Sequence, residues 1–574
     1  MSTPEISLLL QDIDPNDHSA NDYFAIIKTV VSLRNSFIES SPAFHQCQVA
    51  IDIIYTYVED EIKNSRKAPI SQIKFGTSGW RGILGKDLTC RSVRQVTQAI
   101  VDVYREMEND LLLADALGVS TISEARTRGC VIGHDNRFGG KLLADSVADV
   151  LTSNGFTVHY AGESTTGCLS AAVLELNAAF STNLTPSHNP LEYGGFKFNA
   201  SDGGPAAPII TDRITAFARK IIKDNSTLSI SPNPDLIQPF NALDTWRSLV
   251  RKNSSLHGID YDEIIEKFLQ NENCVVAVDS VHGASRIHIR SLFHNSKTDR
   301  LILIRDNDDP TFDGVAPEPS TENMQMVTNI LRSRPEPLKL GIILDPDGDR
   351  IRFTDGTTEI NMNLFGAMAY HYIHEAKGKS GMVAKTVATS NFANSIARAF
   401  GEDIFEPKVG FKEFKPVIDK ALVCFEESDG ITVIGHTPEK DGYIGLVLAL
   451  DMMLMRNQNI GDYLTEIRNK FGYYYPEKDG IVVSQQGKEL KQTLAGLEKY
   501  GAGKTLDVGE NQRTISQVIN IDGLKLILDD DSWLMIRPSG TEPKVRFYVE
   551  ARTESGKNDL FKTARMLLAE IGLI

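Results

Sequence analysis

Three carboxylates stand at alternating positions in the segment DPDGDR, which begins at Asp345 and continues with Asp347 and Asp349 directly after the apolar run LKLGIIL. Where a strand passes into a loop, carboxylates at this spacing can converge on one hard cation, and their oxygen ligands suit Mg²⁺. A calcium EF-hand requires Gly and Glu where this chain has Arg350 and Gly356, so that alternative fails. The loop is a candidate magnesium site, with a solvated acidic turn as the alternative.

A second candidate is Ser187, which lies between two prolines in the segment TPSHNP and precedes His188. Each proline fixes its own φ and restricts the residue before it, which predicts a rigid, exposed turn that presents the serine. Taken alone, this pattern equally describes an ordinary turn. The nearby Gly194, Gly195 and Lys197 add backbone access and a cation, which favours a phosphorylated serine beside the metal.

The segment RPSGTEPKVRF, which begins at Arg537, combines guanidinium groups with a Ser-Gly-Thr turn. Successive backbone N–H groups, two hydroxyls and a guanidinium converge naturally on a phosphate. The predicted phosphate-binding residues are Arg537, Ser539, Gly540, Thr541 and Arg546. A charged β-turn is the alternative.

Carboxylates and hydroxyls also occur in FEESDG, which contains Glu426 and Ser428, and in HTPEKDG, which contains Lys440. At a strand end, these groups can exchange hydrogen bonds with sugar hydroxyls, and the lysine can donate a proton or contact a phosphate. An Asp or Ser cap at a helix N-terminus would have a similar sequence.

The composition excludes several kinds of partner. The formal net charge is −16, and no basic block interleaved with aromatic residues offsets it, which argues against nucleic acid and anionic membranes. The six cysteines form no CxxC pair and indicate reduced, packed thiols. With no basic leader and no apolar run of about eighteen residues, we expect a cytoplasmic protein. Cations for an anionic substrate must therefore be local.

A chain of 574 residues is too long for one hydrophobic core, so several domains must position these loops. A glycine-free helical pattern is followed by alternating β-rich runs and helices, which predicts parallel sheets with crossover helices. Loops at the carboxyl ends of such strands meet at one edge of the sheet. The Pro-rich stretch 229–244 is the best linker candidate. We predict these units: a helical extension at 1–72, then domains at 73–245, 246–360, 361–470 and 471–574.

In chain order, FGTSGWRG, TPSHNP, DPDGDR, FEESDG and RPSGTEPKVRFY resemble the signatures of the α-D-phosphohexomutase superfamily. The resemblance extends from Ile73 to the C-terminus. It implies an α/β fold with three mixed-sheet domains and a smaller C-terminal α+β domain around a central cleft. The helical extension and the insert near 107–128 are not explained by it.

The resemblance also implies roles for individual residues. Ser187 would carry the phosphoryl group, and Asp345, Asp347 and Asp349 would hold Mg²⁺ together with a phosphoserine oxygen. Positive charge or proton transfer would come from Arg81, His188, Lys197, Arg350 and Lys440. Substrate contacts would come from Gly410, Lys412, Glu426, Ser428, Arg537, Ser539, Gly540, Thr541 and Arg546.

The segments GGFKFNASDGGPA, PKVGFKEF and EKDG resemble the phosphoglucomutase branch. This implies interconversion of glucose 1-phosphate and glucose 6-phosphate through glucose 1,6-bisphosphate. Asp429, TTGC at 165–168 and the C-terminal tail depart from that branch, so a phosphomannomutase or another phosphosugar mutase is the alternative. A non-catalytic binding protein of the same fold should have lost Ser187 or a metal-loop aspartate, and all are present. The oligomeric state, monomer or dimer, stays open.

Overall fold

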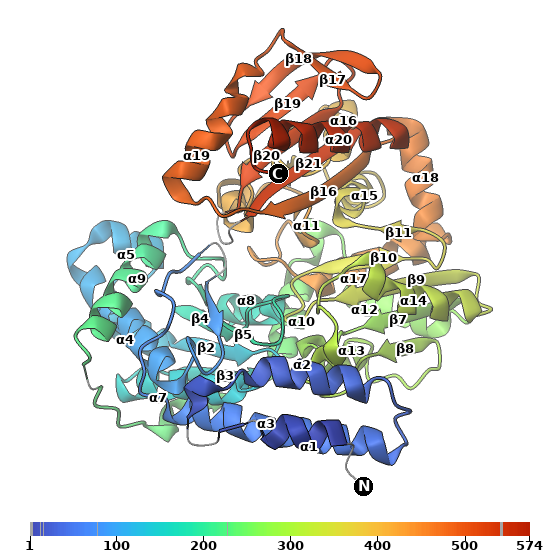
Figure 1. Ribbon diagram of the computed structural model, residues 1–574. Helices are drawn as coiled ribbons and strands as arrows, with labels where there is room; N and C mark the ends of the chain where they lie inside the picture. The colour runs from blue at the N-terminus through green and yellow to red at the C-terminus, as the bar shows by residue number, and fades with distance from the viewer. Residues whose placement is uncertain (1–3, 12, 15–16, 77–78, 227, 540–543) are drawn as a thin grey trace.

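The computed structural model describes residues 4–574 apart from residues 12, 15–16, 77–78, 227 and 540–543 (Figure 1). Within these residues, four sheets follow one another along the chain, each with its own helices, and three α-helices precede them. The first three units are mixed α/β sheets and the last is an antiparallel sheet with helices, which confirms the predicted fold class. No helix among the described residues is long and apolar enough to cross a membrane.

The N-terminal extension consists of α1 (Pro4–Gln11), α2 (Tyr23–Arg34) and α3 (Pro42–Asn64). Side-chain caps begin the two longer helices: Asp22 accepts a hydrogen bond from the N–H of Ala25, and Ser41 accepts one from the N–H of Phe44. The apolar faces of α2 and α3 join the core of the first sheet, so the extension is part of the globular body.

The first sheet has the strand order β1-β5-β4-β2-β3-β6, in which β4, β2, β3 and β6 are parallel. Its strands are β1 (Trp80–Ile83), β2 (Cys130–His134), β3 (Val158–Glu163), β4 (Phe180–Leu184), β5 (Tyr193–Asn199) and β6 (Ile237–Pro239). Its longer helices are α4 (Cys90–Glu106), α7 (Gly140–Ser153), α8 (Thr166–Glu175) and α9 (Pro208–Lys223), and the insert near 107–128 forms α5 (Leu111–Leu117) and α6 (Ile122–Arg128).

Strand β2 shows how the two faces of this sheet are used. Because side chains alternate along a strand, Cys130 and Ile132 face the core that contains the extension, whereas Val131 faces the core shared with the second and third units. The predicted linker at 229–244 differs from expectation, because Ile237–Pro239 pairs with β3 as the edge strand of the sheet. A proline is tolerated there since an edge strand leaves one row of N–H groups unpaired.

The second sheet, β11-β10-β9-β7-β8, and the third, β13-β12-β14-β15, share one apolar core. The second has β7 (Cys274–Asp279), β8 (Leu301–Ile304), β9 (Leu338–Leu344), β10 (Ile351–Thr354) and β11 (Glu359–Ile360), with helices α10 (Ala242–Lys252), α12 (Tyr261–Gln270) and α14 (Thr321–Ser333). The third has β12 (Val383–Lys385), β13 (Ile404–Phe405), β14 (Val423–Glu426) and β15 (Gly430–Val433), with α15 (Met362–Glu375), α16 (Phe392–Phe400), α17 (Gly442–Arg456) and α18 (Ile460–Phe471).

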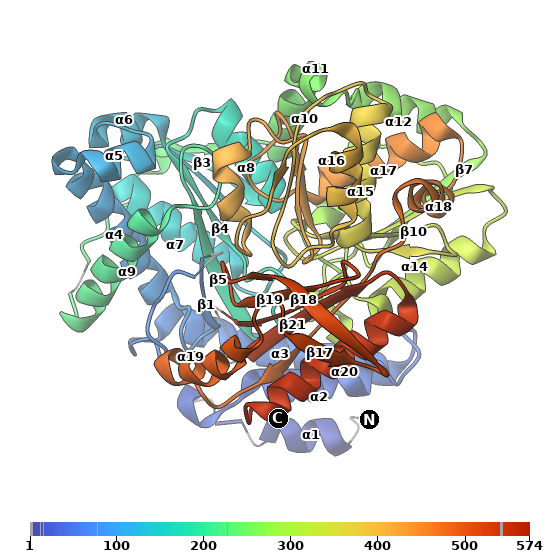
Figure 2. The same ribbon diagram turned by 90° about the horizontal axis from the view of Figure 1, so that it is seen from above.

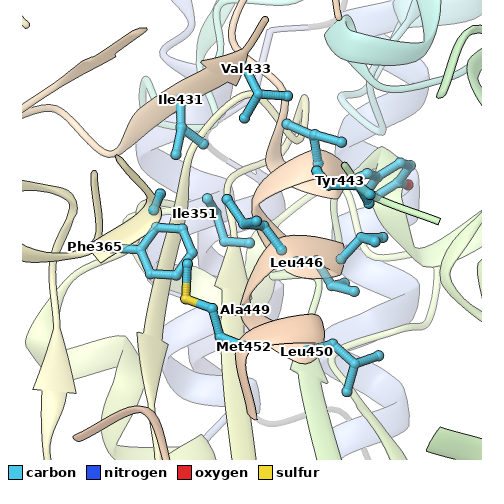
Figure 3. Close-up of a cluster of buried hydrophobic side chains, with 14 of the residues drawn as sticks. Ile351, Phe365, Ile431, Val433, Tyr443, Leu446, Ala449, Leu450 and Met452 are labelled. Atoms are coloured by element: carbon cyan, nitrogen blue, oxygen red, sulfur yellow. The ribbon is translucent and has the colours of Figure 1, made fainter. Parts of the chain in front are cut away.

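Helix α17 lies at the centre of this shared core. Figure 3 shows its Leu446 and Met452 among side chains from β10, α15 and β15, including Ile351 and Ile431. A helix that is apolar all round is buried on all sides. The packing fixes the loop before β10 and the loop between β14 and β15 relative to each other, and these loops carry two of the candidate motifs.

The C-terminal unit is an antiparallel sheet in the order β16-β21-β20-β19-β18-β17, covered by α20 (Glu554–Glu570). Its strands are β16 (Tyr475–Val482), β17 (Thr505–Val508), β18 (Asn511–Ile519), β19 (Leu524–Leu528), β20 (Trp533–Pro538) and β21 (Lys544–Ala551), and α19 (Gly487–Ala495) follows β16. Figure 1 shows this unit at the top of the molecule and the N-terminal extension at the bottom, and Figure 2 shows the same arrangement from above, where the two overlap in the view.

Candidate active site

The metal loop connects β9 to the antiparallel β10 and carries Asp345, Asp347 and Asp349. Their relative exposures are 0%, 0% and 1%, and one ligand oxygen from each lies within 4.8 Å of those of the other two. Gly348 adopts a left-handed φ of 63°, and a Cβ there would lie 2.7 Å from a methyl group of Thr165. The acidic residues therefore form a buried cluster and not a solvated turn.

The donor set of this cluster fits a hard divalent cation. Oδ1 of Asp347 and Oδ1 of Asp349 are buried, and neither accepts a hydrogen bond from any described residue. Such atoms are costly to bury unless something satisfies them, and carboxylate oxygens are the ligands that Mg²⁺ prefers. Burial and the charges of its two neighbours raise the pKa of Asp345 well above its ordinary value. A cation at this position would relieve that repulsion.

Ser187 lies between β4 and β5, and its hydroxyl donates a 2.7 Å hydrogen bond to Oδ2 of Asp345. The prediction of an exposed turn is wrong, because Ser187 is only 2% exposed. The turn folds inward instead: the N–H of Ser187 donates to Oγ1 of Thr185 at 2.9 Å, and Nη2 of Arg137 donates to the carbonyl of Ser187 at 2.7 Å. Its φ of 58° is uncommon for a residue with a Cβ and marks a site that the surroundings hold in place.

Two lysines lie beside the cluster. Nζ of Lys197, on β5, contacts Oδ2 of Asp347 and lies 2.9 Å from Oδ2 of Asp349, and Nζ of Lys440 lies 3.3 Å from the same Asp349 oxygen. Burial lowers the pKa of Lys197, but the two carboxylates outweigh it and hold the pKa well above its ordinary value. The pKa of Lys440 is also raised, since Asp349 and Glu426 outweigh burial. Both lysines are therefore cationic.

His188 differs from these cations. Burial, with the nearby guanidinium groups of Arg350 and Arg81, lowers the pKa of His188 well below its ordinary value, so its imidazole is neutral. Its Nδ1 lies 3.4 Å from the hydroxyl oxygen of Ser187. A neutral ring at this position can accept a proton but supplies no positive charge.

The FEESDG loop, with the predicted sugar contacts Glu426 and Ser428, connects β14 to β15. Oγ of Ser428 donates a 2.8 Å hydrogen bond to Oε1 of Glu426, and burial raises the pKa of Glu426. Asp429, a departure from the family pattern, has a left-handed φ of 69° and forms a 2.7 Å ion pair with Arg352. It holds the hairpin against β10 and does not line the cleft.

One cleft brings together groups from all four units. Its walls include twelve of the predicted residues: Arg81, His188, Lys197, Arg350, Gly410, Lys412, Glu426, Ser428, Lys440, Arg537, Ser539 and Arg546. Ser187 and the three aspartates are not part of this lining but adjoin it, because Lys197 and Lys440 pair with Asp349 and His188 lies next to Ser187. Two predicted residues, Gly540 and Thr541, lie outside the described part of the chain.

In the C-terminal unit, Arg537 at the end of β20 is held by Asp522, whose Oδ2 lies 3.0 Å from Nε of the arginine. The same carboxylate oxygen accepts a 3.1 Å hydrogen bond from the N–H of Val409, beside Gly410. The predicted phosphate loop and the PKVGFKEF stretch are therefore joined through one side chain across the cleft.

The sequence reasoning missed several residues of the site. Thr166 donates a 2.7 Å hydrogen bond from Oγ1 to Oδ2 of Asp347, and its N–H donates to the Asp347 carbonyl at 2.8 Å. Its only signal was the TTGC segment, which forms the N-cap and the first residues of α8. Glu427 and Glu439 line the cleft beside the predicted Glu426 and Lys440, and their signal was their place inside the FEESDG and HTPEKDG segments.

Comparison with protein families matches all four units. Models of the phosphoglucomutase/phosphomannomutase family match domain I at residues 72–225, domain II at 260–358, domain III at 361–471 and the C-terminal domain at 488–565. The chain belongs to the phosphoglucomutase/phosphomannomutase family, within the α-D-phosphohexomutase superfamily of intramolecular phosphotransferases. The extension before residue 72 lies outside these matches.

The individual relatives are all named as phosphosugar mutases, but their names give different sugar substrates. A phosphoglucosamine/phosphogalactosamine mutase of Sulfurisphaera tokodaii is 25% identical over 86% of this chain and 98% of its own length. A phosphoglucomutase/phosphomannomutase of Thermococcus kodakarensis is 24% identical over 86% and 98%. Among solved structures, a putative phosphomannomutase of Thermus thermophilus has a TM-score of 0.69 at 22% identity, covering 87% of this chain and 99% of its own.

Proposed function

We propose that this chain is a magnesium-dependent phosphoglucomutase, which interconverts glucose 1-phosphate and glucose 6-phosphate through a phosphorylated Ser187 and glucose 1,6-bisphosphate. The observation that carries the proposal is the 2.7 Å hydrogen bond from the Ser187 hydroxyl to Asp345, inside a buried carboxylate cluster at the base of a cationic cleft. In this arrangement, a phosphoryl group on Ser187 would lie where a metal and fixed cations can neutralise its charge.

Asp345, Asp347 and Asp349, with an oxygen on Ser187, would hold Mg²⁺, which would stabilise charge on the transferring phosphoryl group. Lys197 and the half-buried Arg350 add fixed positive charge around the same oxygens.

In the proposed cycle, the phosphoryl group leaves Ser187 for the free O6 or O1 hydroxyl of the bound hexose monophosphate. The P–O bond to the serine breaks as the bond to the sugar oxygen forms. The sugar hydroxyl loses a proton and the serine oxygen gains one, and His188, whose Nδ1 lies 3.4 Å from the serine oxygen, is suited to deliver it there. The product is a hexose 1,6-bisphosphate. After the sugar turns over in the cleft, its other phosphoryl group returns to Ser187 and leaves the isomeric monophosphate.

A second phosphate site is necessary because the non-reacting phosphate must be held during each transfer. Arg537, Ser539 and Arg546 line the cleft from the C-terminal unit and supply guanidinium groups and a hydroxyl suited to it. This second site distinguishes a mutase from a phosphatase, which would have no use for it.

The decisive assay follows conversion of glucose 1-phosphate to glucose 6-phosphate with a coupled dehydrogenase, a trace of glucose 1,6-bisphosphate, and Mg²⁺ or EDTA. We expect turnover only with Mg²⁺. Absence of turnover with any hexose 1-phosphate, together with measurable binding of the sugar phosphate, would favour the alternative of a non-catalytic binding protein. Turnover of glucosamine 1-phosphate or mannose 1-phosphate well above that of glucose 1-phosphate would support the mutase activity but contradict the preference for glucose.

Arg537→Ala should mainly raise KM, since Arg537 is proposed to grip the non-reacting phosphate. Loss of charge-assisted hydrogen bonds corresponds to about 2–4 kcal/mol in binding, with a smaller decrease in kcat. Arg513→Ala is the matched control, because Arg513 is an arginine of the same sheet paired with Asp529 and Asp530 away from the cleft. Steady-state kinetics on both variants make the comparison. If Arg537→Ala left KM unchanged, the phosphate site would have to lie elsewhere.

Glu426→Gln should lower kcat/KM for glucose 1-phosphate and for mannose 1-phosphate by similar factors. The hexose binds in two orientations, so Glu426 and Ser428 are suited to O3 and O4, which nearly exchange when the ring turns over. The C2 hydroxyl, which alone separates the two sugars, is then not recognised by this loop. Mannose 1-phosphate should be a poorer substrate and not a rejected one, because a mispositioned hydroxyl costs ~1–3 kcal/mol.

Specificity constants for both sugars on the wild type and on Glu426→Gln provide the measurement. Asp429→Asn serves as a comparison: it should affect stability through the ion pair with Arg352 and leave the ratio of the two sugars unchanged. A loss at Glu426 confined to one sugar would contradict the O3/O4 role, and a clear preference for mannose 1-phosphate would contradict the phosphoglucomutase assignment.

A further inference from the structure

The C-terminal end of α2 forms ion pairs and a hydrogen bond with the turn at residues 309–314 of the second unit. Nη2 of Arg34 lies 2.9 Å from Oδ1 of Asp313 and 3.3 Å from Oδ2 of Asp309, and Arg34 is only 4% exposed. Nδ2 of Asn35 donates a 2.8 Å hydrogen bond to the carbonyl of Asp313. Nη1 of Arg34 donates to Oε1 of Gln48 on α3 at 2.8 Å, so α3 helps to hold the Arg34 side chain in place.

The turn held in this way has an unusual backbone. Phe312, Asp313 and Gly314 have consecutive φ values of 53°, 54° and 75°, and the first two carry a Cβ that disfavours this left-handed conformation. A Cβ on Gly314 would lie 2.8 Å from a methyl group of Val31 on α2. A conformation of this kind persists only when its surroundings impose it. Here Asp309 holds the turn from within, since its Oδ2 accepts a 3.2 Å hydrogen bond from the N–H of Asp313, and the extension holds it from outside.

Phe312 connects this turn to the catalytic serine. It is fully buried, and the guanidinium carbon of Arg137 lies 4.9 Å from the centre of its ring. Arg137 in turn donates to the carbonyls of Ser187 at 2.7 Å and of Pro190 at 2.6 Å, and also to that of Asn189. One side chain thus satisfies three carbonyls of the serine loop, and the Phe312 ring forms part of its support.

A second contact reaches the same loop from α2. Nζ of Lys28 lies 2.8 Å from Oε1 of Glu192, which follows the loop directly before β5. On α3, the ring of Tyr55 stacks on Phe138, next to Arg137, with 4.1 Å between ring centres. Helices α2 and α3 therefore contact the segment that leads from the serine loop into β5 and the residue next to Arg137.

We propose that the N-terminal extension positions the phosphoserine loop, and that Arg34 and Asn35 are positioning residues that act through Phe312 and Arg137 on Ser187. The inference rests on the proposed function, because it assigns a role in phosphoryl transfer. The extension lies outside the residues matched by the family models, so this chain supplies from its own added segment a support that acts behind the loop, away from the cleft.

The test compares Arg34→Met, Asn35→Ala and the control Lys63→Met by steady-state kinetics and by single-turnover transfer from the phosphorylated enzyme to glucose 1-phosphate. Lys63→Met breaks an exposed ion pair with Glu59 on the same extension without touching the relay. Misplacement of a reacting group by a fraction of an ångström to one ångström lowers rates by up to about 100-fold. We expect kcat and the single-turnover rate to fall together about 10- to 100-fold in Arg34→Met and less in Asn35→Ala. KM should stay within about twofold, because the phosphate site on the C-terminal unit is untouched.

The double variant Arg34→Met with Asp313→Asn should have a kcat only slightly lower than that of Arg34→Met alone, since both changes break the same ion pair. Circular dichroism establishes that each variant is folded, and if Arg34→Met does not fold, Asn35→Ala decides by the same readouts. Unchanged kcat in folded variants, or a rise in KM with kcat intact, would overturn the inference. Lack of turnover by the wild type would instead overturn the proposed function.

Discussion

Ser187→Ala should abolish mutase turnover, with a loss of about 10⁴-fold or more, while the protein stays folded. The serine would form the covalent intermediate, and alanine offers no oxygen to carry the phosphoryl group. The change to the fold is small, because the side chain contributes one hydrogen bond to Asp345, worth about 1 kcal/mol, and leaves no sizeable cavity. The coupled assay measures the loss, and circular dichroism measures the fold.

Intact mass gives an independent readout. Wild-type protein incubated with glucose 1,6-bisphosphate should gain the mass of one phosphoryl group, and Ser187→Ala should gain none. Ser333→Ala, at an exposed serine near the end of α14, is the control and should gain the phosphoryl group and turn over normally. Substantial turnover by Ser187→Ala, or the same mass gain, would show that another residue carries the phosphoryl group.

The motifs of the site could be predicted because each stands at the end of a local pattern. DPDGDR follows an apolar strand, and FEESDG ends another, so their neighbours in sequence were enough to place them on loops. The convergence of these loops on one cleft could not be predicted in the same way, because the loops belong to separate sheets and meet only through the packing of the four units.

The burial of Ser187 and of the three aspartates could not be predicted from the sequence. Pro, Ser, His and Asn around Ser187 are typical of an exposed turn, yet the turn is buried because Arg137, Thr185 and Asp345 supply hydrogen bonds from distant parts of the chain. The burial of the metal loop depends in the same way on Lys197 and Thr166. Polar residues can be buried only when such partners are present, and a linear pattern does not show which partners fold against them.

The extension illustrates a further limit. Its helical spacing could be seen in the sequence, but its contacts with the second unit depend on Asp309 and Asp313, almost three hundred residues away along the chain. Those residues lie in a polar loop without a recognisable pattern. Only the folded arrangement brings them to Arg34.

Asp347→Asn should remove both Mg²⁺ binding and turnover while leaving the fold intact. The substitution keeps the size of the side chain but removes its charge, and the amide replaces one carboxylate oxygen of the cluster. Electrostatic stabilisation by a bound metal contributes several kcal/mol to phosphoryl transfer, so we expect a loss of about 10²–10⁴-fold in kcat. EDTA should have the same effect on the wild type. Asp308→Asn, whose side chain is 75% exposed, is the matched control.

Thermal unfolding separates loss of the metal from loss of the fold. A ligand that binds only the folded state stabilises it by RT ln(1 + [L]/Kd), which is about 2.7 kcal/mol at one hundred times Kd. Mg²⁺ should therefore raise the Tm of the wild type and of Asp308→Asn, and should leave the Tm of Asp347→Asn unchanged. Because Lys197 already contacts Oδ2 of Asp347, the metal must bind through the unsatisfied Oδ1 atoms or displace the ammonium group. Near-normal turnover of Asp347→Asn in EDTA, or an equal rise of its Tm with Mg²⁺, would contradict the metal assignment.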